Sequence, residues 1–382
     1  MVFIKKVTII CSIERNTVTL HPQKPKYEVF NMVTISTNIR KSVTEAVEAI
    51  KHDKLFLLTD ETTEQLCKPL LQDIPCMKDA TSIVIGATDT HKNLDTLAQV
   101  WTQLSNEKGS RHSLMVNLGG GMVTDLGGFA ASTFKRGIPY INIPTTLLSM
   151  VDASVGGKTG INFNGLKNEI AVFRAPETVI IDTEFLRTLD HENICSGYAE
   201  MLKHGLINRA QHPTTNSQLS TLLSFDLDHV DYPLLGQMVG DSVAIKQQIV
   251  EEDPLELGIR KALNLGHTVG HAFESWALTR HPYLHGYAVA WGLICELYLS
   301  VVKTGFPTEK MRQTVRFIKE NYGILTITCD DYPELHELMT HDKKNADGII
   351  NFTLLGDIGD IRINQTATKD EIYEALDFFR EG

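Results

Sequence analysis

Histidines and carboxylates in the second half of the chain have the types and spacing that a divalent metal requires. His267 and His271 are four residues apart, so on a helix both rings project from one face. His285 follows, and Glu200 belongs to an earlier helical segment. A lone histidine among apolar residues is more often a core residue than a ligand, but three with a helical glutamate favour a metal site. Spacing alone predicts His267 and His271 as the ligand pair.

A triple glycine has the composition of a phosphate-binding turn. Gly119, Gly120 and Gly121 follow a β-rich run and precede the start of a helical segment. Glycines let the backbone approach a phosphate closely, and a helix N-terminus offers free N–H groups with partial positive charge. Their order differs from the common dinucleotide fingerprint. From this motif alone, a tight turn without a ligand is an equally good interpretation.

Polar residues are dense between Lys135 and Lys203, in otherwise apolar surroundings. Two glycines precede Lys158, which suggests a lysine on a close-fitting loop, where its ammonium can meet a phosphate or carboxylate. A solvated loop is the ordinary alternative. Asp152 favours the functional interpretation, because Val151 and Val155 make its segment too apolar for a free surface loop.

The composition is that of a soluble globular protein. The 382 residues are 42% apolar and 22% charged, enough for two domains. The net charge of −11 argues against nucleic acid or an anionic membrane as the main partner. The six cysteines form no C-x-x-C pair, which suits reduced thiols in the cytoplasm. No apolar run approaches the roughly 18–20 residues of a membrane span.

The first part of the chain alternates β-rich and helical runs, which predicts a parallel sheet covered by helices. Helices are expected at Val43–Ile50 and Leu94–Leu104, among others. The β-rich runs are Val33–Ser36, Leu55–Thr59, Ile83–Ile85, Leu114–Asn117, Tyr140–Ile143 and Val179–Ile181.

Helical patterns dominate after about residue 184. They cover Cys195–Ile207, Leu234–Glu251, His267–Ala277, Tyr287–Val302, Glu309–Tyr322 and Glu371–Phe379. Only Ile349–Leu355 and Asp360–Ile363 read as strands there, as a hairpin. We therefore expect an α/β nucleotide-binding domain with a parallel sheet at 32–183 and a mostly α-helical metal- and substrate-binding domain at 184–382. The active site is expected in the cleft between them. Residues 1–31 form an extension of uncertain status, and Met32 could be the true start.

Taken together, these motifs resemble the 3-dehydroquinate synthase family, part of the sugar phosphate cyclase superfamily. They occur in the order and approximate spacing of that family, from about Asp60 to Lys344. The matching segments are Gly119–Leu126, Lys135–Pro139, Pro144–Leu148, Val151–Gly160, Leu166–Asn168, Tyr198–Gly205, Leu263–Ala272 and Leu284–Ala290.

The resemblance implies a phosphate lyase of the shikimate pathway, which leads to chorismate and the aromatic amino acids. Such an enzyme converts 3-deoxy-D-arabino-heptulosonate 7-phosphate to 3-dehydroquinate and phosphate. NAD transiently oxidises a ring hydroxyl, phosphate is eliminated, NADH returns the hydride, and an intramolecular aldol reaction closes the carbocycle. The expected cofactors are NAD and a divalent metal, zinc most readily, with cobalt as an alternative. An anionic substrate would explain the Lys/Arg cluster.

Metal and substrate roles are carried over residue by residue. The resemblance implies Glu200, His267 and His285 as metal ligands. His271 is then expected to contact the substrate, whereas the spacing alone predicted it as a metal ligand. Arg136 matches an arginine that reaches the phosphate in the neighbouring subunit, which implies a homodimer. The other substrate residues implied are Asp152, Lys158, Lys167, Asn168, Lys203, Lys246, Arg260, Asn264 and Lys343.

The resemblance also implies the NAD contacts. Asp89 is a shorter acid than the glutamate usual at its position in the family. The implied set is Asp60, Asp89, Lys92, Gly120, Gly121, Asp125, Thr145, Thr146, Lys158, Lys167 and Thr188.

Three alternatives remain open at this point. Another sugar phosphate cyclase would share the fold and the first step. A metal-dependent polyol dehydrogenase would share the glycine turn, but would need no Lys/Arg cluster and would produce NADH. A relative that has lost catalysis would bind NAD without turnover.

Overall fold

The computed structural model describes residues 13–14, 17–18, 32–209, 215–340 and 349–381. The first two pairs are the short antiparallel strands β1 (Ile13–Glu14) and β2 (Thr17–Val18). Most of the expected extension 1–31 lies outside the described residues, and so does Lys343, so the predictions made for them stay untested.

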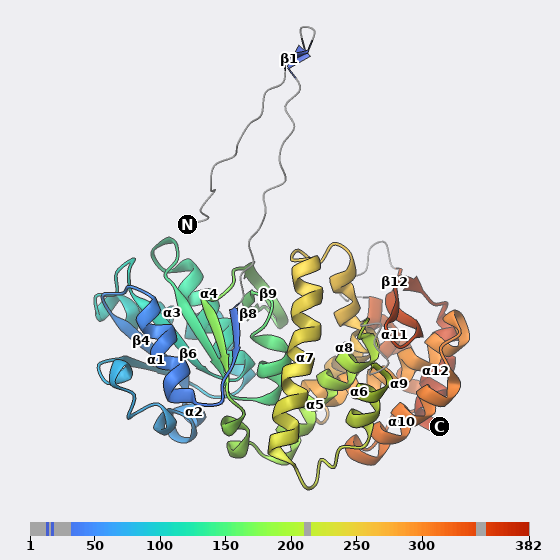
Figure 1. Cartoon of the computed structure of the whole chain (residues 1–382). Helices are drawn as coiled ribbons and strands as arrows, with labels where there is room; N and C mark the ends of the chain where they lie inside the picture. The colour runs from blue at the N-terminus through green and yellow to red at the C-terminus, as the bar shows by residue number, and fades with distance from the viewer. Residues whose placement is uncertain (1–12, 15–16, 19–31, 210–214, 341–348, 382) are drawn as a thin grey trace.

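Six parallel strands form the sheet of the first part (Figure 1). All six predicted β-rich runs are confirmed as strands, in the spatial order β3-β10-β7-β6-β4-β5. Four of them, β4, β6, β7 and β10, are buried along their whole length, as parallel strands covered on both faces must be. The strands are β3 (Met32–Ile35), β4 (Leu55–Asp60), β5 (Thr81–Ile85), β6 (Leu114–Gly119), β7 (Tyr140–Pro144) and β10 (Thr178–Ile181).

Helices cover the two faces of this sheet. Alternate residues of β4 point to opposite faces, so Leu57 joins the apolar cluster that includes Val43 of α1 (Ile39–Ala49). Phe56 joins the other cluster, with Leu97 of α3 (Leu94–Asn106) and residues of α4 (Gly121–Thr133). The predicted helices at 43–50 and 94–104 are confirmed, as is the helix start after the triple glycine. A short helix, α2 (Glu61–Leu66), follows β4.

A second, unpredicted hairpin projects beside the sheet. Its strands are β8 (Lys158–Phe163) and β9 (Leu166–Phe173), which pair antiparallel. We expected a loop here, because two glycines precede Lys158. The structure explains this, since every residue of β9 is exposed.

The second part is mostly helical, as predicted, and all six expected helices are present. They are α5 (His191–Ile207), α7 (Tyr232–Glu252), α8 (His267–Ala277), α9 (His285–Thr304), α10 (Thr308–Tyr322) and α12 (Lys369–Glu381). Two shorter helices, α6 (Thr215–Leu223) and α11 (Tyr332–Thr340), were not predicted. The expected hairpin is β11 (Asn351–Asp357) with β12 (Asp360–Thr366). The domain boundary after residue 183 stays a prediction.

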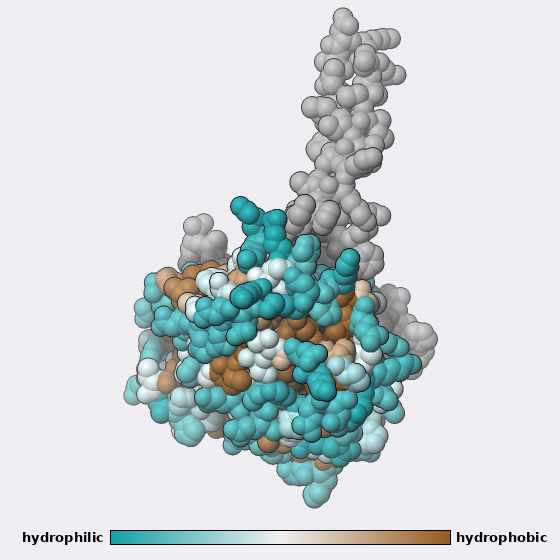
Figure 2. All heavy atoms as spheres, turned by 90° about the vertical axis from the view of Figure 1, so that its left-hand side faces the viewer, coloured by the Kyte–Doolittle hydropathy of each residue, from teal (hydrophilic) through white to brown (hydrophobic). Residues whose placement is uncertain are grey.

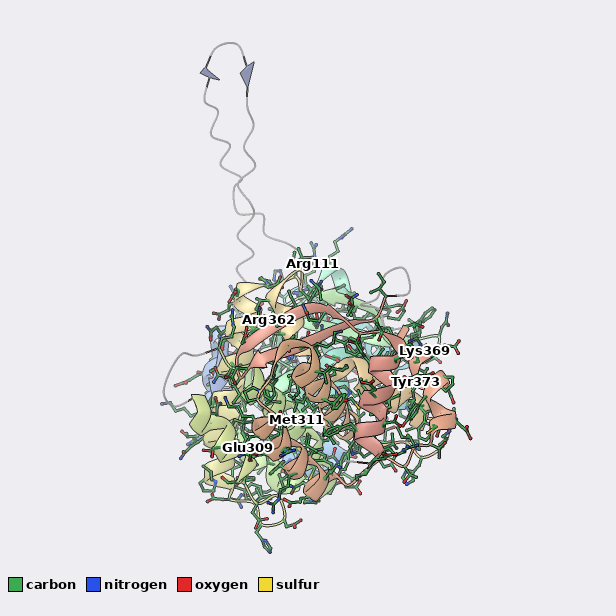
Figure 3. All side chains as sticks on the ribbon, turned by 90° about the vertical axis from the view of Figure 1, so that its right-hand side faces the viewer. Arg111, Glu309, Met311, Arg362, Lys369 and Tyr373 are labelled. Carbon is green, nitrogen blue, oxygen red and sulfur yellow. The ribbon has the colours of Figure 1, made fainter. Side chains whose placement is uncertain are left out.

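Helix α12 closes the C-terminal side of the molecule. Figure 3 shows Lys369 and Tyr373 on it, and the lysine Nζ lies 5.3 Å from the centre of the tyrosine ring. On its inner face, Phe379 packs against Phe273 of α8 with 5.0 Å between ring centres. The last helix therefore packs against the helix that carries His267 and His271.

Helix α9 is the centre of this helical part. By length and composition it is apolar enough to cross a membrane, so the expectation that no run approaches that length was wrong. Its most apolar window is 72% buried inside the structure. A helix that is apolar on every side is one that is packed on every side, and α9 contacts α5, α8, α10 and α12.

Candidate active site

The loops that follow four strands bring several predicted NAD residues to one edge of the sheet. Asp60 ends β4, Asp89 begins the short helix η3 (Asp89–His91) after β5, Gly120 follows β6, and Thr145 follows β7. The strands are parallel and neighbours in pairs, so these residues meet at their common carboxyl end. This edge is where open α/β sheets bind ligands.

The glycine turn leaves the start of α4 open to an anion. Gly120 is the N-cap, and no side chain caps the helix. A Cβ at Gly120 would lie 3.0 Å from Thr146 Cγ2, and one at Gly121 would lie 3.3 Å from Ala153 Cβ, so the turn packs closely against the next loop. An uncapped helix N-terminus suits a phosphate.

A buried ion pair joins this edge to the hairpin. Lys92 Nζ lies 2.5 Å from both Asp125 Oδ2 and Asn168 Oδ1, and Lys92 is only 5% exposed. Burial raises the pKa of Asp125, against the opposing effect of Lys92. The Asn162 amide donates to Asp89 Oδ2 at 3.0 Å. The Asn168 backbone N–H donates to Asn162 Oδ1 at 3.0 Å, so three predicted NAD residues, Asp89, Lys92 and Asp125, belong to one network.

Two predicted NAD residues, Asp60 and Thr188, have evident structural contacts. Asp60 Oδ1 accepts from the backbone N–H groups of Thr62 and Thr63, and so caps α2. Thr188 lies at the end of the short helix η6 (Thr183–Thr188), with its Oγ1 3.9 Å from Cys67 Sγ. Their proposed NAD contacts stay predictions.

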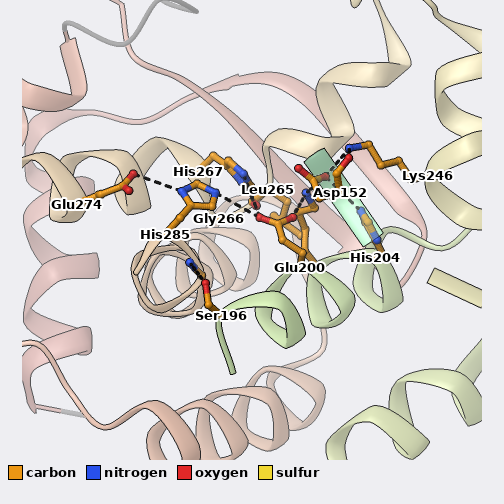
Figure 4. A network of polar contacts seen from close by, with 12 residues as sticks. Asp152, Ser196, Glu200, His204, Lys246, Leu265, Gly266, His267, Glu274 and His285 are labelled. Carbon is orange, nitrogen blue, oxygen red and sulfur yellow. Dashed lines mark hydrogen bonds and ion pairs between the residues drawn. The ribbon is translucent and has the colours of Figure 1, made fainter. Parts of the chain in front are cut away.

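Glu200, His267 and His285 come together between α5, α8 and α9 (Figure 4). Glu200 Oε1 lies 3.4 Å from His267 Nε2 and 3.5 Å from His285 Nε2. Donor atoms of His271 and the other two histidines also lie within 4.8 Å of one another. Glu200, His267 and His285, which the resemblance implies as ligands, are therefore near enough to share an ion. The same holds for His267 and His271, the pair expected from spacing.

The chemistry of Glu200 fits a divalent metal. Its side chain is fully buried, and neither carboxylate oxygen has a partner with hydrogen-bond geometry. Burial would raise its pKa, but Lys203 and His267 hold the pKa well below the ordinary value, so the group is an anion. Lys203 already pairs with Oε2, which leaves Oε1 facing the two imidazoles, and a carboxylate with two imidazoles is a typical zinc-binding set.

Asp152 is the centre of a second charged group. It lies in the short π-helix η5 (Ser149–Ala153), and its Oδ1 accepts from Lys246 Nζ at 2.6 Å. Lys203 Nζ lies 3.8 Å from the same oxygen and also pairs with Glu200. His204 Nε2 is 4.0 Å away. Asp152, Glu200 and His204 could by distance hold an ion, but the two lysine ammoniums already balance the two carboxylates.

Two lysines of the hairpin reach glutamates of the helical part. Lys158 pairs with Glu256, which also accepts from the Asn264 amide at 3.3 Å. Lys167 Nζ lies 2.6 Å from Glu274 Oε1, and Glu274 Oε2 lies 3.3 Å from His285 Nδ1.

Burial would lower the pKa of His285, but Glu274 and Glu200 raise it to about 10. The ring therefore contacts a carboxylate through each of its nitrogens. This geometry fixes how the imidazole is oriented toward Glu200.

Arg260 is buried, unlike Lys158 and Lys167. It is 2% exposed and donates to the carbonyls of Pro254 and Gly156 at 2.6 and 3.0 Å. Arg136 is an exposed residue at the end of η4 (Phe134–Arg136). The structure thus brings most of the predicted set together, and the role of Arg136 stays a prediction.

Several participants were not predicted as site residues. His204 is four residues after Glu200 on α5, and this spacing could have indicated it. Glu274 is three residues after His271 on α8, which is the same kind of signal. Glu256 gave no such signal, since it lies in the connection after α7 and meets Lys158 only through the tertiary fold.

Comparison with known proteins gives a consistent result. The family models described as 3-dehydroquinate synthase N-terminal and C-terminal match residues 82–196 and 197–345. A 3-dehydroquinate synthase of Parabacteroides distasonis is 57% identical over 351 residues, 92% of this chain and 98% of that protein.

Solved structures share the fold. A 2-epi-5-epi-valiolone synthase from Streptomyces hygroscopicus subsp. jinggangensis, with NAD+ and Zn2+ bound, aligns with a TM-score of 0.78 and 24% identity, covering 94% of this chain and 99% of its own. A 2-deoxy-scyllo-inosose synthase complexed with carbaglucose-6-phosphate, NAD+ and Co2+ aligns at 0.77 and 21%, covering 92% and 96%.

Proposed function

The chain belongs to the 3-dehydroquinate synthase family, and we propose how its own residues carry out that activity. The reaction converts 3-deoxy-D-arabino-heptulosonate 7-phosphate to 3-dehydroquinate and phosphate, a step of the shikimate pathway. Because phosphate is eliminated from carbon, we class the enzyme as a phosphate lyase.

The meeting of Glu200, His267 and His285 is the observation that carries the proposal. The three side chains come from three helices, and both imidazole Nε2 atoms face the same buried carboxylate oxygen. We assign them as ligands of a divalent metal, zinc or cobalt. Bound there, the metal supplies a positive charge that acidifies and orients the substrate hydroxyls.

We place NAD at the carboxyl edge of the sheet, with its pyrophosphate on the uncapped start of α4. When bound there, NAD would take a hydride from the ring carbon that bears a hydroxyl, with loss of the hydroxyl proton, and would return the hydride in the same turnover. The ion pair of Lys92 and Asp125 lies directly beside this turn and would position the bound cofactor.

The lysines bind the anionic groups of the substrate. Lys158 and Lys167 are about half exposed and each is paired with a glutamate, so a phosphate or carboxylate oxygen can compete for the ammonium. Lys203 and Lys246 are almost fully buried and hold Asp152 ionised. We assign Asp152, Asn168, Arg260, Asn264 and His271 to the same substrate. No protein base stands out, and the leaving phosphate can itself accept the proton.

We further propose a cytoplasmic homodimer in which Arg136 reaches the phosphate of the neighbouring subunit. Three facts support an interface near the hairpin. Arg136 is exposed, β9 pairs with β8 alone among the described strands, and Leu166 and Phe173 of β9 are 53% and 54% exposed. Figure 2 shows hydrophobic side chains among hydrophilic ones on the face formed by the α/β part.

The test is phosphate release from the heptulosonate phosphate, measured with and without a chelator while NADH absorbance is followed. We expect one phosphate per dehydroquinate, no accumulated NADH, and loss of turnover on chelation that added zinc restores. Steady NADH production would instead indicate a polyol dehydrogenase. Turnover of heptulose phosphates that lack the carboxylate, with none of this substrate, would indicate another sugar phosphate cyclase.

A further inference from the structure

Helix α8 carries His267 and His271, yet it begins at a residue that cannot cap it. Its N-cap is Gly266, in the left-handed conformation with φ 78° and without a side chain to bond the first turn. The first N–H groups of any helix have no partner within the helix and must find one elsewhere when they are buried.

A carboxylate from the neighbouring helix supplies these partners. Glu296 of α9 is completely buried, and its Oε2 accepts from the Gly266 N–H at 2.7 Å. Its Oε1 accepts from the N–H groups of Thr268 and Val269 at 3.0 and 3.2 Å. Three backbone donors thus converge on one anion, placed where the helix dipole favours negative charge.

Glycines bring the two helices close enough for this contact. A Cβ at Gly292 of α9 would lie 2.0 Å from Gly266 O and 2.7 Å from Gly270 N. A Cβ at Gly270 would lie 2.8 Å from Ala288 O. The backbones of α8 and α9 therefore touch, and Glu296, one turn beyond Gly292, reaches the start of α8.

The capped turn is the one that orients His267. His267 is the first residue of α8, and its Nδ1 lies 3.0 Å from Leu265 O, which leaves Nε2 facing Glu200 Oε1 (Figure 4). His285 is the first residue of α9. Their ring centres are 5.4 Å apart, so the register between the two helices sets the spacing of the two imidazoles.

We propose that Glu296 is a positioning residue for the metal site: it caps α8 from α9 and so fixes His267 relative to His285. The inference rests on the proposed function, because it takes Glu200, His267 and His285 to be the ligands. Glu296 touches no ligand side chain in the contacts described above, and it acts through the backbone of the first turn.

The test compares Glu296→Gln with a matched control, Ser300→Ala. Glutamine keeps the volume, but it has one acceptor oxygen and turns an N–H group toward backbone N–H groups. Ser300 is also fully buried on α9, one turn later, and its hydroxyl donates to Glu296 O at 2.7 Å and accepts from Leu355 N at 3.1 Å. Ser300→Ala therefore removes two buried hydrogen bonds, neither of which involves α8.

Metal-free proteins are titrated with Zn2+ in competition with a chromophoric chelator, and the Co2+ absorption spectrum reports the ligand geometry. We expect Glu296→Gln to bind Zn2+ about tenfold or more weakly than the wild type and to change the Co2+ spectrum. Ser300→Ala should bind like the wild type. If Glu296→Gln does not fold, Glu296→Asp keeps the charge on a shorter side chain and should show an intermediate affinity.

Equal Zn2+ affinity of the wild type and the Glu296 variants would overturn this inference and leave the proposed function intact. Equal weakening by Ser300→Ala would overturn it as well, since the effect would then come from general packing. A wild-type chain that binds no Zn2+ or Co2+ would overturn the proposed metal dependence itself. That result is distinguishable from the two above, in which the wild type does bind metal.

Discussion

Buried charges with charged partners distinguish the site residues from the ordinary core. Glu200 and Lys203 are essentially inaccessible to solvent, and Asp152 and Lys246 continue the same network. Burying such groups costs more free energy than most ion pairs return, so the arrangement is better explained by chemistry than by stability. The resemblance to the family supplied these four residues from sequence. Their partner His204, 4.0 Å from Asp152 Oδ1, was missed, although its position four residues after Glu200 on α5 could have indicated it.

His204 leads to a prediction about acid stability. Burial lowers its pKa to about 3, with Lys203 acting in the same direction, and Asp152 and Glu200 oppose the shift. Its Nδ1 lies 2.7 Å from Ser242 Oγ. An unfolded histidine has a pKa of about 6.5. The unfolded chain therefore binds more protons between these values, so this contribution is complete above about pH 6.5 and is lost as the pH falls toward 3.

We expect the free energy of unfolding of the metal-free wild type to lose about 2 kcal/mol through His204 between about pH 7.5 and pH 5. His204→Gln, which can still bond Ser242, should lack this loss. Urea unfolding in chelator at the two pH values measures the difference. The control His281→Gln, at an exposed position, should follow the wild type. A parallel pH dependence in wild type and His204→Gln would contradict the prediction.

At the scale of elements, apolar runs were the reliable signal. All six strands of the sheet were predicted from β-rich runs, and four of them, β4, β6, β7 and β10, are buried on both faces, which makes their sequences mostly apolar. The strand β9 was missed because its residues are all exposed and carry Lys167, Asn168 and Glu169 among apolar ones. β9 forms a strand because it pairs with β8, and this pairing cannot be predicted from the local sequence pattern of β9.

The glycine contact between α8 and α9 predicts a sharp contrast between two Gly→Ala substitutions. Gly292→Ala places a Cβ 2.0 Å from Gly266 O, so we expect it to destabilise the protein by about 1–3 kcal/mol. Gly240 lies within α7 with no atom within 4 Å of a Cβ built there, so Gly240→Ala should stabilise by about 0.5–1 kcal/mol. Urea unfolding of the two variants measures both. An unchanged stability of Gly292→Ala would show that the helices do not touch as described.

At the scale of the whole molecule, opposite charges meet across the two parts of the chain. Lys158 and Lys167 of the hairpin pair with Glu256 and Glu274, and Asp152 pairs with Lys246 of α7. Sequence could supply the lysines as anion-binding residues, but not these glutamate partners, because each pair joins segments about a hundred residues apart. Contacts between subunits are equally hard to predict from sequence. The resemblance implies that Arg136 acts in the neighbouring subunit, but the fold of a single chain does not show that contact.

Arg136 can be placed by mixing two inactive variants. If it completes the site of the neighbouring subunit, Arg136→Gln and Glu200→Gln should each have little activity, because each homodimer lacks one group in both sites. A hybrid dimer of the two has one intact site, built from Glu200 of one subunit and Arg136 of the other. Random reassociation gives hybrids in half of the dimers, so we expect recovery of about a quarter of the wild-type turnover.

The matched control for this mixing experiment is Glu200→Gln with Lys203→Met. Both residues lie on α5 of the same subunit, so no pairing of these two variants contains an intact site, and activity should stay low. Phosphate release after joint refolding measures both mixtures. Recovery in the Arg136 mixture alone requires that the arginine act across the interface, because subunit exchange and refolding are common to the two mixtures. Failure of the Arg136 mixture, or full activity of Arg136→Gln on its own, would place the arginine outside the neighbouring site.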